Sequence, residues 1–289
     1  MIERLRNSWE LVKASGRVLQ ADTELLLFPV FSGIAMILVT VTFIVPLAIG
    51  GIATSKGGGP AVGAYIVFLA FYFIQYSVII FFNSALVGAA QIRLRGGDPT
   101  VSDGINIALR NLTSILGYAA IAATVGLILK IVRDKAGFVG KILAAIGGIA
   151  WSLATYLVVP VLVARGVGPI EAIKQSASIL KRTWGEQIAG SVGIGLVFGF
   201  GTLIYSLIAI PLVVVSAVSG APVAVTIGLA GVVVLGYILL AVVSSALKGV
   251  YSAALYEFAT TGEASMFDRT LLASAFHRTL LASAFQTKR

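Results

Sequence analysis

Six long apolar stretches dominate the chain, and each is long enough to form a helix that crosses a bilayer. Such a helix needs about 20 residues, because each residue adds about 1.5 Å. The stretches cover residues 25–53, 61–92, 112–132, 142–164, 188–218 and 222–247. The segments left over are too short for a separate soluble domain. The pattern therefore predicts an all-α, polytopic membrane bundle of about six transmembrane helices, forming one domain over residues 1–262.

Shorter helical patterns precede the first, third and fifth stretches. Apolar residues recur there at spacings of three and four, around residues 5–19, 101–115 and 170–184. In the last of these, Ile173, Leu180 and Trp184 share one face, and Lys174 and Lys181 lie on the other. This is the stripe of an amphipathic helix, in a segment too polar to span. We predict three amphipathic interfacial helices on one side of the bundle.

The same order of one amphipathic helix and two spans occurs three times. The corresponding segments are residues 3–95, 96–165 and 166–265, which differ in length and share few identical residues. The order indicates a threefold repeat. The alternative is that amphipathic linkers arose between spans without duplication.

Most Lys and Arg residues between the spans lie on the side that carries the amphipathic helices and both ends of the chain. The positive-inside rule then places both termini in the cytoplasm and the protein in the cell membrane. The group Lys130, Arg133, Lys135 and Lys141, between the third and fourth spans, is the exception. The residues before the first span are rich in acidic side chains and lack an apolar stretch, so we expect no signal peptide.

Composition narrows the chemistry further. The chain has 289 residues, 58% apolar and 11% charged, with no cysteine and one histidine, His277. All acidic residues fall outside the predicted spans, whereas proton relays and ion-coupled carriers usually use a buried ionisable group. The residue sets of intramembrane proteases and zinc enzymes are also missing. We therefore expect no enzyme activity, no metal or cofactor and no nucleic-acid partner.

Basic residues beside the amphipathic faces are candidates for contact with anionic lipid, at about 1 kcal/mol each. They are Lys13, Arg17, Arg93, Arg95, Arg110, Lys174, Lys181 and Arg182. Trp9 and Trp184 are candidate interfacial anchors, because tryptophan favours the headgroup layer. The alternative interpretation is that these helices only cap the bundle, and the two roles are compatible.

Uncharged polar residues concentrate on one face of the second span, where Tyr72, Gln75, Tyr76 and Asn83 fall within about 100 degrees of one another. They could line a narrow polar path or hold a lipid headgroup, and more commonly such residues join neighbouring helices by hydrogen bonds. In the fifth span, Gly195 and Gly199 have the spacing of a close helix contact.

Several short motifs resemble the pattern of an uncharacterised prokaryotic family of multi-pass membrane proteins, known only as a domain of unknown function. The motifs are Ser8-Trp9, LLLFP from Leu25 to Pro29, WSLAT from Trp151 to Thr155, VPVL from Val159 to Leu162, GPIEA from Gly168 to Ala172, and Ser176 with TWGE from Thr183 to Glu186. The resemblance covers residues 2–276, and it supplies no functional residue. A looser similarity reaches membrane domains attached to some glycerophosphodiester phosphodiesterases, and the Yip-type proteins.

The tail, residues 263–289, contains RTLLASAF twice, from Arg269 to Phe276 and from Arg278 to Phe285. A period of nine residues turns a helix by about 900 degrees, so the two Leu-Leu pairs would face opposite sides. We interpret the second copy as a recent duplication. The alternatives are a bivalent segment that binds two partners or one that clasps a neighbouring subunit.

Two classes of function remain from the sequence. One is a non-enzymatic membrane organiser or accessory subunit that binds anionic lipid and a protein partner or a second copy. The other is a passive channel or carrier for an uncharged or lipid-like solute. We favour the first, because nothing in the predicted spans selects or couples an ion.

Overall fold

The computed structural model describes residues 2–50, 62–135, 137–184, 193–262 and 267, and all regular structure in them is helical. For residues 2–9, 11, 46–50, 62–65, 182–184 and 193–197 it describes the backbone alone. In chain order the elements are α1 (Ile2–Ala21), the short 3-10 helix η1 (Thr23–Leu26), α2 (Leu27–Gly50), α3 (Val62–Leu94), α4 (Val101–Arg110), α5 (Leu112–Lys135), α6 (Gly137–Ala154), α7 (Val158–Arg165), α8 (Pro169–Trp184), α9 (Gly193–Val218) and α10 (Val223–Thr261). The all-α prediction is confirmed for this part of the chain.

Six of the described segments are long and apolar enough to cross a membrane, which agrees with the six predicted spans. They are Thr23–Val45, Ile66–Leu94, Leu112–Lys135, Gly137–Arg165, Phe198–Val218 and Val223–Thr261. Many of their large side chains stay exposed, such as Ile37 at 63% and Leu207 at 67%. Large apolar surfaces of this extent are typical of helices that face lipid.

Two helices differ from the predicted bounds. The last span was expected to end at residue 247, but α10 continues to Thr261 and buries its final turns in the protein core. The fourth span is interrupted, because α6 ends at Ala154 and α7 begins at Val158. Pro160 lies in the first turn of α7, where a missing backbone N–H costs no helical hydrogen bond.

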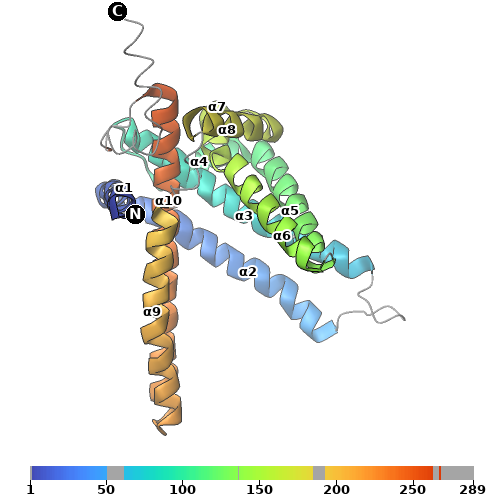
Figure 1. Ribbon diagram of the computed structural model, residues 1–289, viewed down its shortest axis with the longest axis vertical. Coiled ribbons are helices and arrows are strands. Elements are labelled where there is room, and N and C mark those ends of the chain that lie inside the picture. Colours follow the sequence, from blue (N-terminus) through green and yellow to red (C-terminus); the bar gives the residue numbers. More distant parts are fainter. Residues whose placement is uncertain (1, 51–61, 136, 185–192, 263–266, 268–289) are drawn as a thin grey trace, which may run out of the picture.

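The hydrophobic core lies at one end of the molecule, where α1, α4 and α8 meet the ends of α3, α7 and α10 (Figure 1). Each of α1, α4 and α8 places a small residue in this core: Ala14, Ala108 and Ala172 are fully buried. Small side chains let helices approach closely. The apolar faces of these three helices are therefore used, at least in part, to cap the bundle.

Away from this core the spans separate into two groups. Figure 1 shows α9 and α10 running side by side as one arm, while α2, α3, α5 and α6 leave the core in a different direction. The arm is held by polar contacts between its helices. The Ser206 and Tyr237 hydroxyls are 2.6 Å apart, Tyr205 donates to the Val233 carbonyl at 3.1 Å, and the Tyr205 and Tyr237 rings pack edge to face.

The three predicted repeat units correspond, in the described chain, to α1 to α3, α4 to α7, and α8 to α10. The second span of each unit ends near the core at a glycine with positive φ: Gly96, Gly166 and Gly262. A left-handed glycine is the usual way to stop a helix and turn the chain. The duplication that this order suggests stays a prediction.

Candidate functional site

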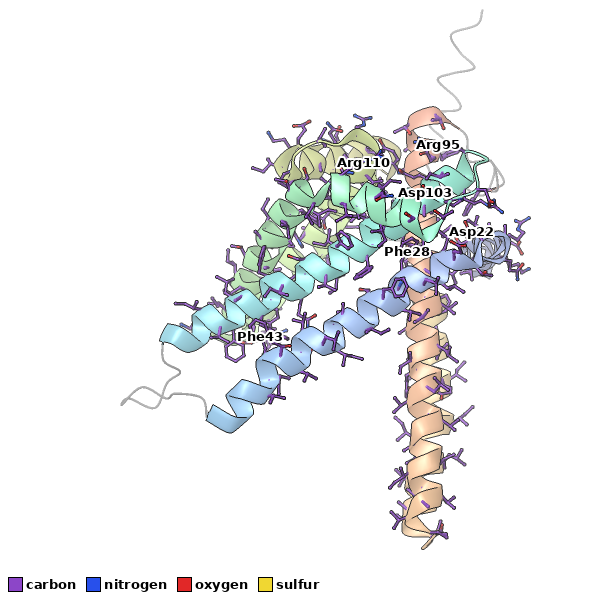
Figure 2. All side chains as sticks on the ribbon, turned by 180° about the vertical axis from the view of Figure 1, so that it is seen from behind. Asp22, Phe28, Phe43, Arg95, Asp103 and Arg110 are labelled. Carbon is purple, nitrogen blue, oxygen red and sulfur yellow. The ribbon has the colours of Figure 1, made fainter. Side chains whose placement is uncertain are left out.

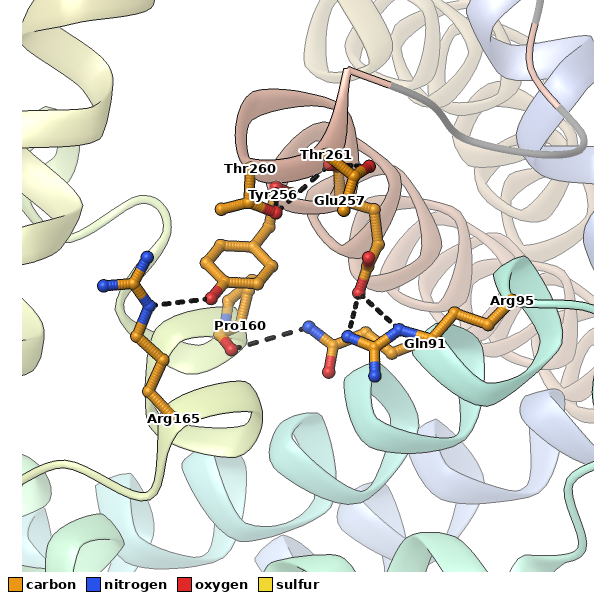
Figure 3. Close-up of polar contacts among 8 residues, drawn as sticks. All are labelled: Gln91, Arg95, Pro160, Arg165, Tyr256, Glu257, Thr260 and Thr261. Carbon is orange, nitrogen blue, oxygen red and sulfur yellow. Dashed lines mark hydrogen bonds and ion pairs between the residues drawn. The ribbon is translucent and has the colours of Figure 1, made fainter.

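The ends of α3, α7 and α10 meet in a polar junction (Figure 3). Arg95 donates to Oε1 of Glu257 through Nε at 3.1 Å and through Nη2 at 2.5 Å. Gln91 Nε2 faces the carbonyl of Pro160 at 3.5 Å. Glu257 is buried, so its charge requires this partner.

Arg165 joins α7 to two other helices at the same junction. Its Nε donates to the Tyr256 hydroxyl at 3.1 Å, and its Nη1 donates to Oε1 of Gln175 at 2.9 Å. Gln175 in turn donates to Glu171. The end of α10 is thereby bonded to Arg95 after α3 and to Arg165 of α7, and Arg165 in turn connects it to α8.

The start of α4 is fixed by a capping box, in which the cap and the third helical residue satisfy each other's backbone groups. Asp103 N–H donates to Thr100 Oγ1, and the Thr100 N–H and hydroxyl both donate to Asp103 Oδ2. These hydrogen bonds from Thr100 lower the pKa of the Asp103 carboxyl. The Val101 N–H donates to Glu24 Oε2 at 2.9 Å, which ties α4 to η1.

Asp22 lies between α1 and η1 at the same end of the molecule. Burial raises the pKa of its carboxyl above the ordinary value, and the neighbouring Arg93 guanidinium opposes this rise. Arg93 itself donates to the Ala21 carbonyl at 2.8 Å and to Asp98 at 2.9 Å. One Asp22 oxygen, Oδ2, is buried with no hydrogen-bond partner among the described groups.

The predicted lipid-contact residues divide into two groups. Arg93 and Arg95 bind acidic or carbonyl groups of the chain, and Lys13 pairs with Glu10 at 2.9 Å. Of the predicted residues whose side chains are described, Arg17, Arg110, Lys174 and Lys181 are exposed and form no ion pair with a described side chain. The side chains of Arg182, Trp9 and Trp184 lie outside the described residues, as do the tail copies of RTLLASAF. Figure 2 shows Arg95, Asp103 and Arg110 at the core end, far from Phe43 on α2.

The polar face predicted on the second span divides among three neighbours. Gln75 donates to Thr40 on α2 at 2.8 Å. Tyr72 and Tyr76 line a small pocket against α5, with the Lys130 ammonium 5.7 Å from the centre of the Tyr72 ring. Asn83 lines a different pocket, beside α2 and α10. These residues therefore share a helix face without sharing one polar path.

The glycine contact predicted in the fifth span is found at another position. A Cβ on Gly199 would meet no described atom within 4 Å, and the surroundings of Gly195 lie outside the described residues. Instead, a Cβ on Gly236 of α10 would overlap the Tyr205 side chain of α9. The Tyr205 side chain occupies the space that a Cβ at Gly236 would need. The spacing of glycines within one helix cannot indicate this contact, because Tyr205 lies on another helix.

Two further residues at this end were missed as site candidates. Both lie on α10: Lys248 directly follows the end of the predicted span, and Glu257 lies beyond it. The available signal was weak: single charged residues at the end of an apolar stretch, without any indication of their partners.

The six apolar segments, their exposed faces and the one-ended core define a membrane-embedded helical protein. Within this class, the sequence profile of a family of unknown function, DUF6159, matches residues 61–266. The chain belongs to this family. The matched region includes the TWGE motif, whereas the motifs from Ser8 to Pro29 precede it.

No curated protein matches the chain. No solved structure matches it either. The two looser similarities, to phosphodiesterase membrane domains and to Yip-type proteins, are not supported by these comparisons.

Proposed function

We propose that the protein is a non-enzymatic membrane organiser or accessory subunit of the cell membrane, which holds anionic lipid against the outer faces of α4 and α8. Both termini then lie in the cytoplasm. The observation that carries this proposal is the position of Arg110, Lys174 and Lys181, which are exposed on helices whose opposite faces are buried. Each such cation near an anionic surface contributes about 1 kcal/mol.

Apolar residues beside these cations support the same role. Leu109 is exposed next to Arg110, and Ile170 is exposed one helical turn before Lys174. A surface with exposed apolar and basic groups suits the boundary between headgroups and acyl chains. In Figure 1, α8 lies across the direction of α9 and α10, as expected of a helix in the plane of the interface.

A passive carrier for an uncharged solute is less well supported. It needs a continuous polar path through the spans, whereas Gln75, Tyr76 and Asn83 face three different neighbours. We propose the tail as the segment that binds a protein partner. In-membrane crosslinking followed by mass spectrometry would identify that partner.

The test compares two triple variants of the full chain in a neutral detergent with equal amounts of phosphatidylglycerol and phosphatidylcholine. Replacing Arg110, Lys174 and Lys181 with Gln should lower the number of phosphatidylglycerol molecules retained per chain in native mass spectrometry. The control replaces Lys130, Lys135 and Lys141, three exposed lysines near the other ends of α5 and α6. Equal retention by both variants would refute the proposal.

A further inference from the structure

A pocket of about 270 Å³ lies where α2, α3 and α10 cross, at the edge of the core. Its polar lining comes from Ser32 on α2, Asn83 on α3, Tyr156 just before α7, and Ser245, Lys248 and Ser252 on α10. Phe28, Phe82 and Leu86 supply apolar walls. Convergent polar groups on an apolar wall are the usual composition of a small-molecule site.

Close helix packing fixes the walls of this pocket. A Cβ on Gly249 would overlap the buried Leu86 side chain and would lie 3.5 Å from Oδ1 of Asn83. Only glycine at this position lets α10 approach α3 so closely. Because Leu86 and Val250 are buried beside it, the pocket is held by the core and is formed before any ligand arrives.

Lys248 gives the pocket a positive charge. It is exposed, it forms no ion pair with a described side chain, and no acidic residue lines the pocket. Lys248 lies about 37 Å along α10 from Val223, at about 1.5 Å per residue, whereas the apolar layer of a bilayer is about 30 Å thick. The ammonium group therefore reaches the headgroup layer, where lipid phosphates lie.

The size of the pocket restricts what it can hold. Pockets that enclose a drug-sized molecule are about 300–1,000 Å³, so this one accommodates a headgroup but not acyl chains. An apolar track continues from it along the same face of α10, where Ile238 and Val234 are 51% and 56% exposed. Chains attached to a headgroup in the pocket would have this surface to lie on.

We propose that this pocket binds the phosphate headgroup of one anionic glycerophospholipid, with Lys248 as its cation and Asn83 and Ser245 as hydrogen-bond donors. The site goes beyond the proposed function, because it uses none of the residues on the outer faces of α4 and α8. It would hold one specific lipid between the α9–α10 arm and α2, rather than attract lipid in general.

The experiment measures the most tightly held lipid on the full chain by native mass spectrometry, in neutral detergent with phosphatidylglycerol and phosphatidylcholine as probes. Lys248→Gln should lower the preference for phosphatidylglycerol at this one site about fivefold, the effect of one lysine near a membrane surface. Ser245→Leu keeps the charge but fills the pocket, and it should also release the lipid. Lys135→Gln is the matched control and should retain it.

Each other outcome contradicts the proposal. Retention of the lipid by both Lys248→Gln and Ser245→Leu, with unchanged size-exclusion profiles, would place it elsewhere. Its release by glycerol 3-phosphate at millimolar concentration would identify the pocket as a site for a small soluble phosphate. Loss of this lipid only in the Arg110, Lys174 and Lys181 variant would assign it to α4 and α8, refuting the pocket while supporting the proposed function.

Discussion

Arg95 and Glu257 are 162 positions apart in sequence, and Nη2 of the first lies 2.5 Å from Oε1 of the second. Their surroundings differ: the Arg95 side chain is 61% exposed, whereas that of Glu257 is 6% exposed. The pair therefore joins a solvated cation to a buried anion, and its two members should respond differently to substitution.

Arg95→Met should lower the free energy of unfolding by about 3 kcal/mol, because it leaves the buried Glu257 carboxylate without its partner. Glu257→Gln should cost less, about 1 kcal/mol, since the arginine left behind is already in contact with solvent. Unfolding of the purified chain followed by circular dichroism measures both. Arg133→Met, which breaks an exposed pair with Asp134, is the control and should change stability by less than about 0.5 kcal/mol. A larger loss of stability from Glu257→Gln than from Arg95→Met would contradict this asymmetry.

Asp22 and Asp103 should give pH dependences of opposite sign. The pKa of Asp22 is raised by burial, so folding binds a proton in the window from its ordinary value of 3.8 up to the raised pKa, and stability falls as the pH rises through this window. Asp22→Asn should remove this fall. The pKa of Asp103 is lowered by Thr100, so its contribution is present above 3.8 and is lost as the pH falls through the lowered pKa. Asp103→Asn should make acidification less damaging, and chemical unfolding at a series of pH values compares the variants.

Gly236→Ala should destabilise the α9–α10 arm by about 1–3 kcal/mol, because its Cβ would overlap Tyr205. Gly231→Ala on the same helix is the control, since a Cβ there meets no described atom within 4 Å. It should be neutral or slightly stabilising, because alanine favours a helix more than glycine does. Adding Tyr205→Phe to Gly236→Ala should recover part of the loss. Equal unfolding temperatures for the two alanine variants would show that the close contact between Gly236 and Tyr205 does not determine the stability of the arm.

Single cysteines can test the sidedness of the bundle, because the chain has none of its own. Ser102 and Ser178 are exposed on α4 and α8, and Ser219 is exposed at the turn between α9 and α10. With the termini in the cytoplasm, an impermeant thiol reagent added to intact cells should label Ser219→Cys and leave the other two unmodified. Labelling of Ser178→Cys from outside would contradict the proposed topology.

Local signals predicted much of the helix pattern. The spacing of apolar residues predicts a helix around residues 170–184, and α8 runs from Pro169 to Trp184. The spacing around residues 101–115 likewise predicts a helix there, and α4 begins at Val101. There Thr100 acts as the cap, and its bonds with Asp103 decide the first helical residue.

Contacts between distant segments could not be predicted in the same way. The helical wheel groups Gln75, Tyr76 and Asn83 on one face of the second span, but it carries no information about which helix each residue meets. The apolar stretch that predicts the sixth span ends at residue 247, directly before the charged Lys248. The burial of Glu257 depends on Arg95, and no spacing within α10 indicates that partner.

The length of α10 has a mechanical consequence. Its 39 residues form one uninterrupted helix about 58 Å long, which extends from the exposed Val223 to the polar junction at Tyr256 and Glu257. Between these two ends, Gly249 lies where a Cβ would overlap Leu86 of α3. We expect a tilt of the arm, such as one caused by a bilayer of different thickness, to strain the bonds of Tyr256 and Glu257 with Arg165 and Arg95, which lie beyond Gly249 along α10.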